Sequence, residues 1–519
     1  MLLQGVRVDG LPDWDQGRSQ VAALVDWNRP ENNDLLLVTD FRLDRPYDGG
    51  ARFVVLDAVL FINGIPFAVI EGVRPDREPT VAEAIADLRA YTGTRLAGDR
   101  QDVPSFFRFV QVLVATNGQE ARIGTITSAP EHYAQWRTVA PAAPEQVRAE
   151  LGYDRRASLT GLETLAASVL RPGHLLDLVR NFTVFHQIDG RTVKIIARYQ
   201  QFRAVHRMIH RLLHGQTRIE TGRDDERGGV VWHTQGSGKS FTMAFLVRKM
   251  RTVLQLADFK VVLVVDRTDL RDQLQASLAL AGETPIVAGG QADARAKLAD
   301  DVPGIVTIMI QHAQRDEYAA AERGEERFVD DPLQSEVRFP VLNTSERIVL
   351  IADEAHRSQR GRLHARLRHA LPNAARIGFT GTPLLRADKE SHTTEAIFGS
   401  FIDQYLLRDS EPDGATVPIR YEQRRADAYV VDAVVLDAMY EQEVGGTPRE
   451  RQEAQRRLVT TRQALESLQL IEPKARDMLR HWVGCVLPNG FKAQLVAISR
   501  LAAVRYQAAL VTVRDELVG

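Results

Sequence analysis

The stretch that decides the fold runs from Gly229 to Ser240, Gly-Val-Val-Trp-His-Thr-Gln-Gly-Ser-Gly-Lys-Ser, an apolar run followed by a glycine-rich loop. With a helical pattern after it, this is the setting of a phosphate-binding loop. Glycines let backbone N–H groups curl around phosphate oxygens, a lysine cation suits the β- and γ-phosphates, and a serine hydroxyl suits Mg²⁺. The stretch predicts an ATP site formed by Thr234, Gly236, Ser237, Gly238, Lys239 and Ser240, in which Ser240 is a metal ligand.

The alternation of short apolar strands with helices continues on both sides of this loop. Strands that end in polar residues are expected at Gly229–Trp232, Val261–Val265, Ile305–Met309, Ile348–Ala352 and Arg376–Phe379. Strands that are buried on both faces and separated by helices form a parallel, doubly wound sheet, which binds ligands at its carboxyl edge. We therefore expect an α/β fold in which the polar motifs meet at that edge.

Two further motifs follow strands of this sheet. Asp353-Glu354-Ala355-His356 supplies Asp353 as a second Mg²⁺ ligand and Glu354 as the catalytic residue that orients and deprotonates the attacking water, with His356 at the ATP site. Thr380-Gly381-Thr382-Pro383 stands where helicase-type motors couple the nucleotide state to interdomain movement, so Thr380, Gly381 and Thr382 are expected to have that role. Each motif alone is common, but their shared order predicts a nucleic-acid motor of helicase superfamily 2.

Three shorter motifs carry weaker predictions. In Tyr199-Gln200-Gln201-Phe202, Gln201 is a candidate for ATP binding through the adenine edge, and the alternative is an ordinary helix start. Asp266-Arg267 and Gln311-His312 end strands on the same edge and are candidates for contacts to the DNA backbone.

Composition excludes several classes of protein. With 66 Lys and Arg against 68 Asp and Glu in 519 residues, no global positive field indicates a nucleic-acid partner, and 44% hydrophobic residues suffice for several domains. The single cysteine, Cys485, is expected to be a small buried residue, and it permits no internal disulfide. No apolar run reaches the roughly 18 residues of a membrane span, and the start lacks the order of a signal peptide. We expect a cytoplasmic protein without membrane contact.

The remaining chain predicts a second α/β domain and several helices. Strand patterns at Asp34–Phe41, Phe53–Leu60, Ile65–Glu71 and Phe109–Ala115, with a helix at Val81–Tyr91, indicate a compact N-terminal domain. Residues 143–181 are helical in pattern. The polar residues 447–472 indicate a solvated helical connection, with a binding helix as the alternative, and they precede a last strand at Ala493–Ile498 and one helix.

The chain resembles the R (restriction, motor) subunit of type I restriction enzymes, and the resemblance runs from about residue 3 to residue 510. The resemblance is carried by Pro30-Glu31-Asn32-Asn33-Asp34, Leu60-Phe61-Ile62-Asn63-Gly64-Ile65-Pro66, the residues 230–240, 352–359 and 378–383. A histidine in place of the first loop glycine, His233, is common among superfamily 2 motors. The resemblance implies a PD-(D/E)xK nuclease before two RecA-like motor domains, and it implies double-stranded DNA, methyltransferase (modification) subunits and specificity subunits as partners.

The resemblance also suggests domain boundaries. We expect a nuclease-like domain at 1–140, a helical bridge at 141–190, a first RecA-like ATP-binding domain at 191–420, and a connection with an incomplete second RecA-like domain at 421–519. Superfamily 2 motors close the ATP site with arginines of the second domain. The chain is therefore expected to bind ATP but to hydrolyse it poorly alone. A truncated chain, a second polypeptide that supplies the rest of the motor, and a decayed reading frame all fit.

The nuclease motif departs from the family pattern. Asp57 and Glu71 match its two catalytic, metal-binding acids. The family places a lysine two residues after the glutamate, where this chain has Val73, and Arg74 would point to the opposite strand face. The family's glutamine, four residues before Tyr91, is replaced by Asp87. These departures favour a weakened nuclease over a working one.

Hairpin geometry adds a constraint. A two-residue turn at Asn63-Gly64 pairs Asp57 with Ile70, so a bulge is needed to bring Asp57 and Glu71 to one face of the sheet.

Three functions fit the sequence. The leading one is ATP-dependent translocation of double-stranded DNA coupled to endonucleolytic cleavage, with ATP and Mg²⁺ as cofactors and an impaired nuclease. The alternatives are a catalytically inactive, nucleotide-binding remnant or regulatory subunit of the restriction-modification complex, and a stand-alone superfamily 2 helicase or remodelling factor. ATP turnover with and without DNA separates the first from the second. Co-purification with methyltransferase subunits separates both from the third.

Overall fold

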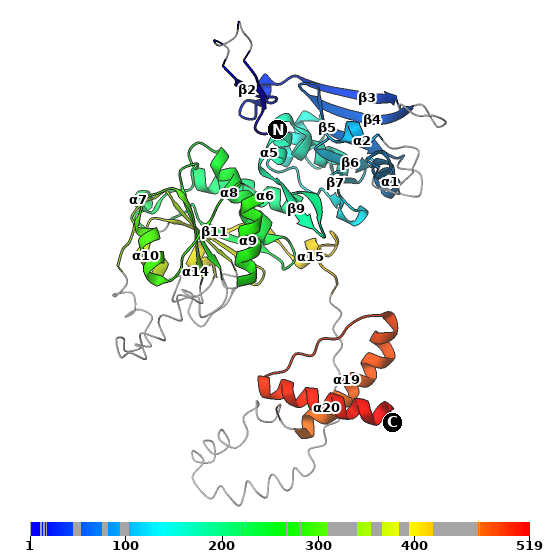
Figure 1. Ribbon diagram of the computed structural model, residues 1–519, viewed down its shortest axis with the longest axis vertical. Coiled ribbons are helices and arrows are strands. Elements are labelled where there is room, and N and C mark those ends of the chain that lie inside the picture. The colour runs from blue at the N-terminus through cyan, green and yellow to red at the C-terminus, as the bar shows by residue number, and fades with distance from the viewer. Residues whose placement is uncertain are drawn as a thin grey trace, which may run out of the picture. The chain divides into compact units, whose positions relative to one another are not determined.

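The structure is a computed structural model that describes residues 2–10, 13, 16, 18–44, 53–74, 81–93, 103–223, 225–265, 268–280, 282–309, 340–353, 366–383, 394–418, 466 and 468–518. The chain divides into two compact units, Met1–Pro418 and Ile419–Gly519 (Figure 1).

The first unit begins with a six-stranded sheet in the order β3-β4-β5-β6-β7-β8. Its strands are antiparallel except for the parallel pair β5 and β6. The strands are β3 Leu35–Asp44, β4 Phe53–Ile62, β5 Ile65–Gly72, β6 Val112–Thr116, β7 Ala121–Gly124 and β8 Ala134–Gln135. The helix α1, Ala82–Tyr91, covers one face, and its buried Leu88 belongs to the same hydrophobic core as Val59 and Val69 of the sheet. The short strands β1, Val6–Val8, and β2, Gln20–Ala22, pair separately, and α2 spans Pro104–Phe107.

A bulge in β5 sets the register of the β4–β5 hairpin. Beyond the turn at Asn63-Gly64, Phe61 pairs with Pro66, but Leu60 pairs with Ala68, so Phe67 is an extra residue on β5. The pairing of Ala58 with Ile70 that follows brings Asp57 opposite Glu71. The bulge that the sequence required is present.

The side chain of Asn63 links two of the phrases that carry the family resemblance. Its Oδ1 accepts a hydrogen bond from the backbone N–H of Asp34 at 2.7 Å, and its Nδ2 donates to Asn33 Oδ1 and to the carbonyl of Leu24, each at 2.9 Å. Asn63 itself is left-handed, with φ of 50°. These asparagines fix the hairpin to the chain before it, which is a structural role.

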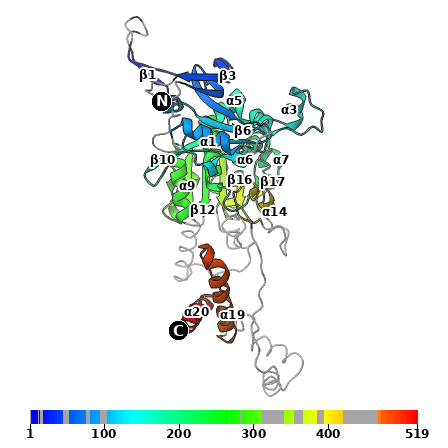
Figure 2. The same ribbon diagram turned by 90° about the vertical axis from the view of Figure 1, so that its right-hand side faces the viewer.

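Helices and a hairpin connect this sheet to the next. They are α3 Pro144–Glu150, α4 Gly161–Leu165, a π-helical turn Ala166–Leu170, α5 Pro172–Asn181, and the hairpin of β9 Thr183–Ile188 and β10 Arg191–Ile196. The hairpin was not predicted, although its turn, Asp189-Gly190, is a typical hairpin signal. The long helix α6, Tyr199–His214, follows. The buried residues of α6 share one hydrophobic core with residues of α5 and of the N-terminal sheet. Figure 2 shows α6 between the N-terminal sheet and the parallel sheet described next.

The second sheet of this unit has seven strands in the order β13-β14-β12-β15-β16-β11-β17, and all of its neighbours are parallel. The strands are β11 Gly229–His233, β12 Lys260–Val265, β13 Ile286–Val287, β14 Gly304–Met309, β15 Ile348–Asp353, β16 Ala375–Thr380 and β17 Phe401–Tyr405. The doubly wound parallel sheet and its five predicted strands are confirmed. The short strand β13 and the edge strand β17 were not predicted.

Helices cover both faces of this sheet (Figure 1). The helices α6, α8 Lys239–Thr252 and α9 Thr268–Leu280 contribute to the core on one face. The helices α10 Gln291–Ala299 and α14 Thr394–Phe398 contribute to a separate core on the other face. The short helices α7 Arg218–Thr221 and α15 Leu407–Ser410 lie in connections.

The described part of the second unit is helical. It consists of α19 Leu468–His481, a π-helical turn Trp482–Val486, a 3₁₀ turn Leu487–Asn489 and α20 Arg500–Val518. The strand expected at Ala493–Ile498 is wrong, because these residues are irregular and pair with no described strand. The expectation that Cys485 is buried is also wrong, since its side chain is exposed. Among the described residues, no helix is both long and apolar enough to cross a membrane.

Candidate ATP site and nuclease-like centre

The glycine-rich loop adopts the shape of a phosphate cradle. β11 ends at His233, and α8 begins at Lys239. Between them Gly236 and Gly238 have φ of 82° and 80°, in the left-handed region that favours glycine. The hydroxyl of Ser237 is buried and finds no hydrogen-bond partner among the described residues. Backbone N–H groups at a helix start, a lysine and an unpaired hydroxyl are donors that fit a phosphate chain.

His233 explains why the loop departs from the strict glycine pattern. Its side chain is fully buried, and burial lowers its pKa, so the imidazole is neutral and donates from Nε2 to Asp403 Oδ2 at 2.8 Å. The carboxylate of Asp403, in β17, also accepts hydrogen bonds from Nε and Nη2 of Arg203, at 2.8 and 2.9 Å, and from Nη1 of Arg207 at 2.6 Å. Burial raises the pKa of Asp403, but the bonds from His233 and Arg203 hold that pKa below its usual value. A buried carboxylate therefore holds the start of the phosphate loop to α6 and to β17.

Gln201, the candidate for adenine binding, contacts the phosphate loop. Its Nε2 donates to the carbonyl of Gly238 at 3.1 Å, and its Oε1 accepts from the backbone N–H of Arg198 at 2.9 Å. A Cβ atom on Gly238 would lie only 2.5 Å from Nε2. The φ value of 80° favours glycine here, and a Cβ atom would also displace the Gln201 amide from the loop.

The other motor motifs lie at the same edge of the sheet. Asp353 ends β15 and is 4% exposed, and Thr380 ends the neighbouring strand β16 and is fully buried. A Cβ atom on Gly381 would lie 3.4 Å from the carbonyl of His233, and that glycine's own carbonyl accepts from Trp232 Nε1 at 3.1 Å. The motif that ends β16 thus touches the phosphate loop. The predicted residues Glu354, His356, Asp266, Arg267, Gln311 and His312 lie outside the described residues.

The N-terminal sheet brings together the residues of the nuclease motif. Glu71 accepts a hydrogen bond from Tyr91 of α1, and Asp57, close enough to act on Glu71 by its charge, accepts one at Oδ2 from the backbone N–H of Gly72 at 2.7 Å. Burial, followed by the charges of Asp57 and Asp87, raises the pKa of Glu71 to about 8, and a hydrogen bond from Tyr91 opposes this shift. One oxygen of Glu71, Oε2, is buried, and no side chain or backbone group in the described part of the chain bonds to it. A cation beside Glu71 would lower the raised pKa of this carboxyl group and would give its Oε2 atom a partner.

The residues around these acids depart from the nuclease pattern in the structure too. Val73 is half-buried and packs against the core under α1, and Arg74 is exposed. No lysine thus stands two residues after Glu71. Within the described ranges, no group of three or more His, Cys, Asp or Glu side chains is placed to hold a metal ion. Among the residues that the structure describes, the centre therefore offers two acids, and Val73 stands where the nuclease pattern has its lysine.

Two family models match the chain. Residues 1–132 match the Type I restriction enzyme R protein N terminus, and residues 200–456 match the SWI2/SNF2 ATPase. The chain is 31% identical to the Type I restriction enzyme HindI endonuclease subunit of Haemophilus influenzae, over 97% of this chain and 45% of that protein. The chain is similar to type I restriction endonuclease subunits over nearly its whole length.

Another relative is similar over the same region. The putative type I restriction enzyme MjaIXP endonuclease subunit of Methanocaldococcus jannaschii is 27% identical, over 97% of this chain and 46% of that protein. The chain spans about half the length of these two curated relatives. Among solved structures, the UvsW helicase from bacteriophage T4 aligns at 14% identity with a TM-score of 0.27, over 50% of this chain and 75% of that one, which is too weak to bear on the fold.

Proposed function

We propose that this chain is the nuclease and first motor part of a type I restriction endonuclease, which uses ATP to translocate double-stranded DNA. The observation that carries the proposal is the meeting of three motifs at one sheet edge, namely the phosphate loop, Asp353 and Thr380–Thr382. In this proposal Lys239 binds the β- and γ-phosphates, and Ser240 and Asp353 hold Mg²⁺. Glu354 orients the attacking water, and His356 completes the site.

Coupling to movement is assigned to Thr380, Gly381 and Thr382. The approach of Gly381 to the carbonyl of His233 supports this role, because a change at the phosphates can reach β16 through direct contact. The expected division into 1–140, 141–190, 191–420 and 421–519 is likewise proposed. The separate sheets of the first unit support the domains 1–140 and 191–420, and the division of the chain at Pro418 supports the boundary near 420.

For the nuclease, we propose that Asp57 and Glu71 hold Mg²⁺ and that cleavage is weak. The buried, unpaired Oε2 of Glu71 and the exposed side chain of Asp57 fit a cation. Mg²⁺ would supply an activated water to attack the phosphate. Val73 and Asp87 stand where the family has lysine and glutamine, so charge on the attacked phosphate would be less well stabilised. DNA, methyltransferase subunits and specificity subunits are the partners proposed.

The experiment is DNA-stimulated ATP turnover by the chain assembled with the methyltransferase and specificity subunits, and with any second polypeptide that completes the motor. We expect turnover that depends on double-stranded DNA and is abolished by Lys239→Ala. Lys297→Ala should retain it, because Lys297 in α10 pairs with the surface residue Asp293. Plasmid cleavage in the same assembly tests the nuclease, with Asp57→Ala as the control. DNA-dependent turnover that survives Lys239→Ala would refute the motor assignment, and efficient cleavage abolished by Asp57→Ala would refute a weak nuclease.

A further inference from the structure

A turn beyond β17, residues 411–416, lies against the phosphate loop. The carbonyl oxygen of Ala415 is 3.3 Å from the position that a Cβ atom on Gly236 would take. The turn is closed by its own bonds, from the N–H groups of Gly414 and Ala415 to the carbonyls of Glu411 and Ser410, at 3.0 and 2.9 Å. Its position therefore sets one wall of the predicted ATP site.

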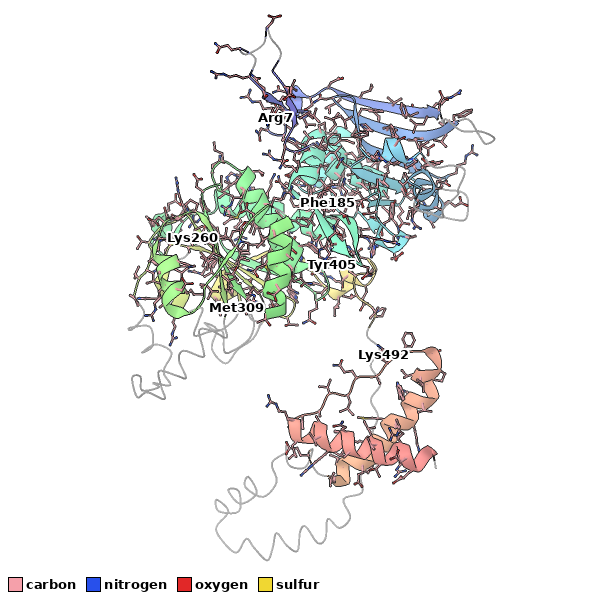
Figure 3. The ribbon with its side chains drawn as sticks, viewed as in Figure 1. Arg7, Phe185, Lys260, Met309, Tyr405 and Lys492 are labelled. Carbon is pink, nitrogen blue, oxygen red and sulfur yellow. The ribbon has the colours of Figure 1, made fainter. Side chains whose placement is uncertain are left out.

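Asp413 joins this turn to two tyrosines. Its Oδ2 accepts the hydroxyl of Tyr199 at 2.8 Å and the hydroxyl of Tyr405 at 2.9 Å. Its side chain is only 8% exposed. Burial, with the hydrogen bond to Asp413, raises the pKa of both tyrosines, so both remain protonated donors. Figure 3 shows Tyr405 beside α15, from which the turn continues.

Each tyrosine also leads directly to the phosphate loop. Tyr199 begins α6 two residues before Gln201, whose amide donates to the carbonyl of Gly238. The backbone carbonyl of Tyr405 accepts from the N–H of Thr234 at 3.0 Å. Asp413 therefore holds both elements that bond to the two ends of the loop.

The remaining oxygen of Asp413 faces the N-terminal domain. Arg137, just after β8, places Nε 3.0 Å from Asp413 Oδ1 and donates from Nη2 to the carbonyl of Pro412 at 3.4 Å. Its guanidinium is oriented by Gln135 Oε1, at 3.0 and 2.6 Å from Nε and Nη2. The preceding Trp136 packs edge-on against Tyr199, with ring centroids 6.5 Å apart. The nuclease-like sheet thus contacts the wall of the ATP site through charge and through an aromatic ring.

We propose that Asp413 and Arg137 are positioning residues for the ATP site, through which the nuclease-like domain sets nucleotide affinity. The inference rests on the proposed binding of ATP at the phosphate loop. Arg137 holds Asp413, Asp413 holds both tyrosines and the turn, and these hold the loop in the shape that accepts phosphates. Coupling between separate sites is reciprocal, so bound nucleotide should in turn tighten the contact between the two domains.

The test is equilibrium binding of a methylanthraniloyl fluorescent analogue of ATP, with Mg²⁺, to the full chain. We expect Arg137→Gln to raise the Kd about fivefold, at the lower end of typical coupling factors. Arg137→Lys should recover part of the affinity, because it restores the charge without the planar fork. Arg122→Gln is the matched control, since Arg122 lies on the neighbouring strand β7 and pairs at the surface with Glu120, and its Kd should stay within about twofold of wild type.

Two comparisons separate the possible failures. If wild type binds the analogue no better than Lys239→Ala, the proposed ATP site fails, and this inference fails with it. If wild type binds and Lys239→Ala does not, while Arg137→Gln binds as tightly as wild type, only this inference is overturned. Thermal unfolding without nucleotide gives the second readout. Arg137 is about one-third exposed, so Arg137→Gln should unfold close to the wild-type temperature, and a loss of affinity that only follows a large loss of stability would overturn a positioning role.

Discussion

Removing the carboxylate of Asp403 should open the sheet beside the phosphate loop. In Asp403→Ala, the neutral His233 and the guanidinium of Arg203 lose an acceptor that lies in a fully buried site. Breaking a buried charge pair from one side typically costs about 3–5 kcal/mol, because the remaining partner stays in the interior without compensation. Arg207 is half exposed and regains water, so the lower part of this range, about 3 kcal/mol, is expected.

The assay is amide hydrogen exchange, read by mass spectrometry on peptides that cover β11 and β17. A loss of about 3 kcal/mol in the free energy of local opening corresponds to about a hundredfold faster exchange where opening limits it. A local readout suits this chain, since a protein with several domains need not unfold in one step.

The matched control is Asp44→Ala. Asp44 pairs with Arg42 at 2.9 Å, but both side chains are more than half exposed. Surface pairs contribute about 0–1 kcal/mol, so exchange in β3 should rise by less than about fivefold. If Asp403→Ala changes exchange in β11 and β17 no more than Asp44→Ala changes it in β3, then the carboxylate does not hold the loop, and the explanation of His233 is wrong.

Two other predictions follow from single contacts. Gly238→Ala should weaken nucleotide binding, because a side chain is strained at its φ of 80° and its Cβ would displace the Gln201 amide, 2.5 Å away, from the loop. Gly190→Ala, with a similar φ of 74° and open space around it, should retain binding at a cost of about 1 kcal/mol in stability. Burial lowers the pKa of Lys194 to about 7, so the folded state binds fewer protons than the unfolded state between about pH 7 and pH 10.5. Wild-type stability should therefore rise across that range, and any advantage of Lys194→Met in denaturant midpoint should be largest below pH 7 and shrink by pH 10.5; an advantage that does not depend on pH would contradict this.

The parts of the fold that the sequence predicted are those with strong local patterns. Strands β11, β12, β14, β15 and β16 are short apolar runs, each buried on both faces, and such runs are readable without knowledge of their neighbours. The edge strand β17 was missed because Asp403 and Gln404 interrupt its apolar pattern. Its aspartate is buried only because α6 supplies two arginines from about 200 residues earlier. The strand expected at Ala493–Ile498 has the apolar pattern of a strand. It did not form one among the described residues, because an apolar run becomes a strand only when it pairs with a neighbouring strand.

The candidate sites divide in the same way. The phosphate loop was predicted because its residues are contiguous, and the order of glycines, lysine and serine is itself the pattern of a phosphate-binding site. The role of Asp413 was not predicted, because it depends on Arg137, Tyr199 and Tyr405, which lie far apart in the sequence. The placement of Asp57 beside Glu71 was predicted in part. The turn and the two acids together required a bulge, but only the structure shows that Phe67 supplies it.

The most direct test of the central claim is calorimetric titration of the chain with ATP and Mg²⁺. The account predicts one site per chain for wild type, binding that weakens when Mg²⁺ is removed, and loss of the site in Lys239→Ala. Equal binding by wild type and Lys239→Ala would contradict it, because the nucleotide would then be held somewhere other than the loop between β11 and α8.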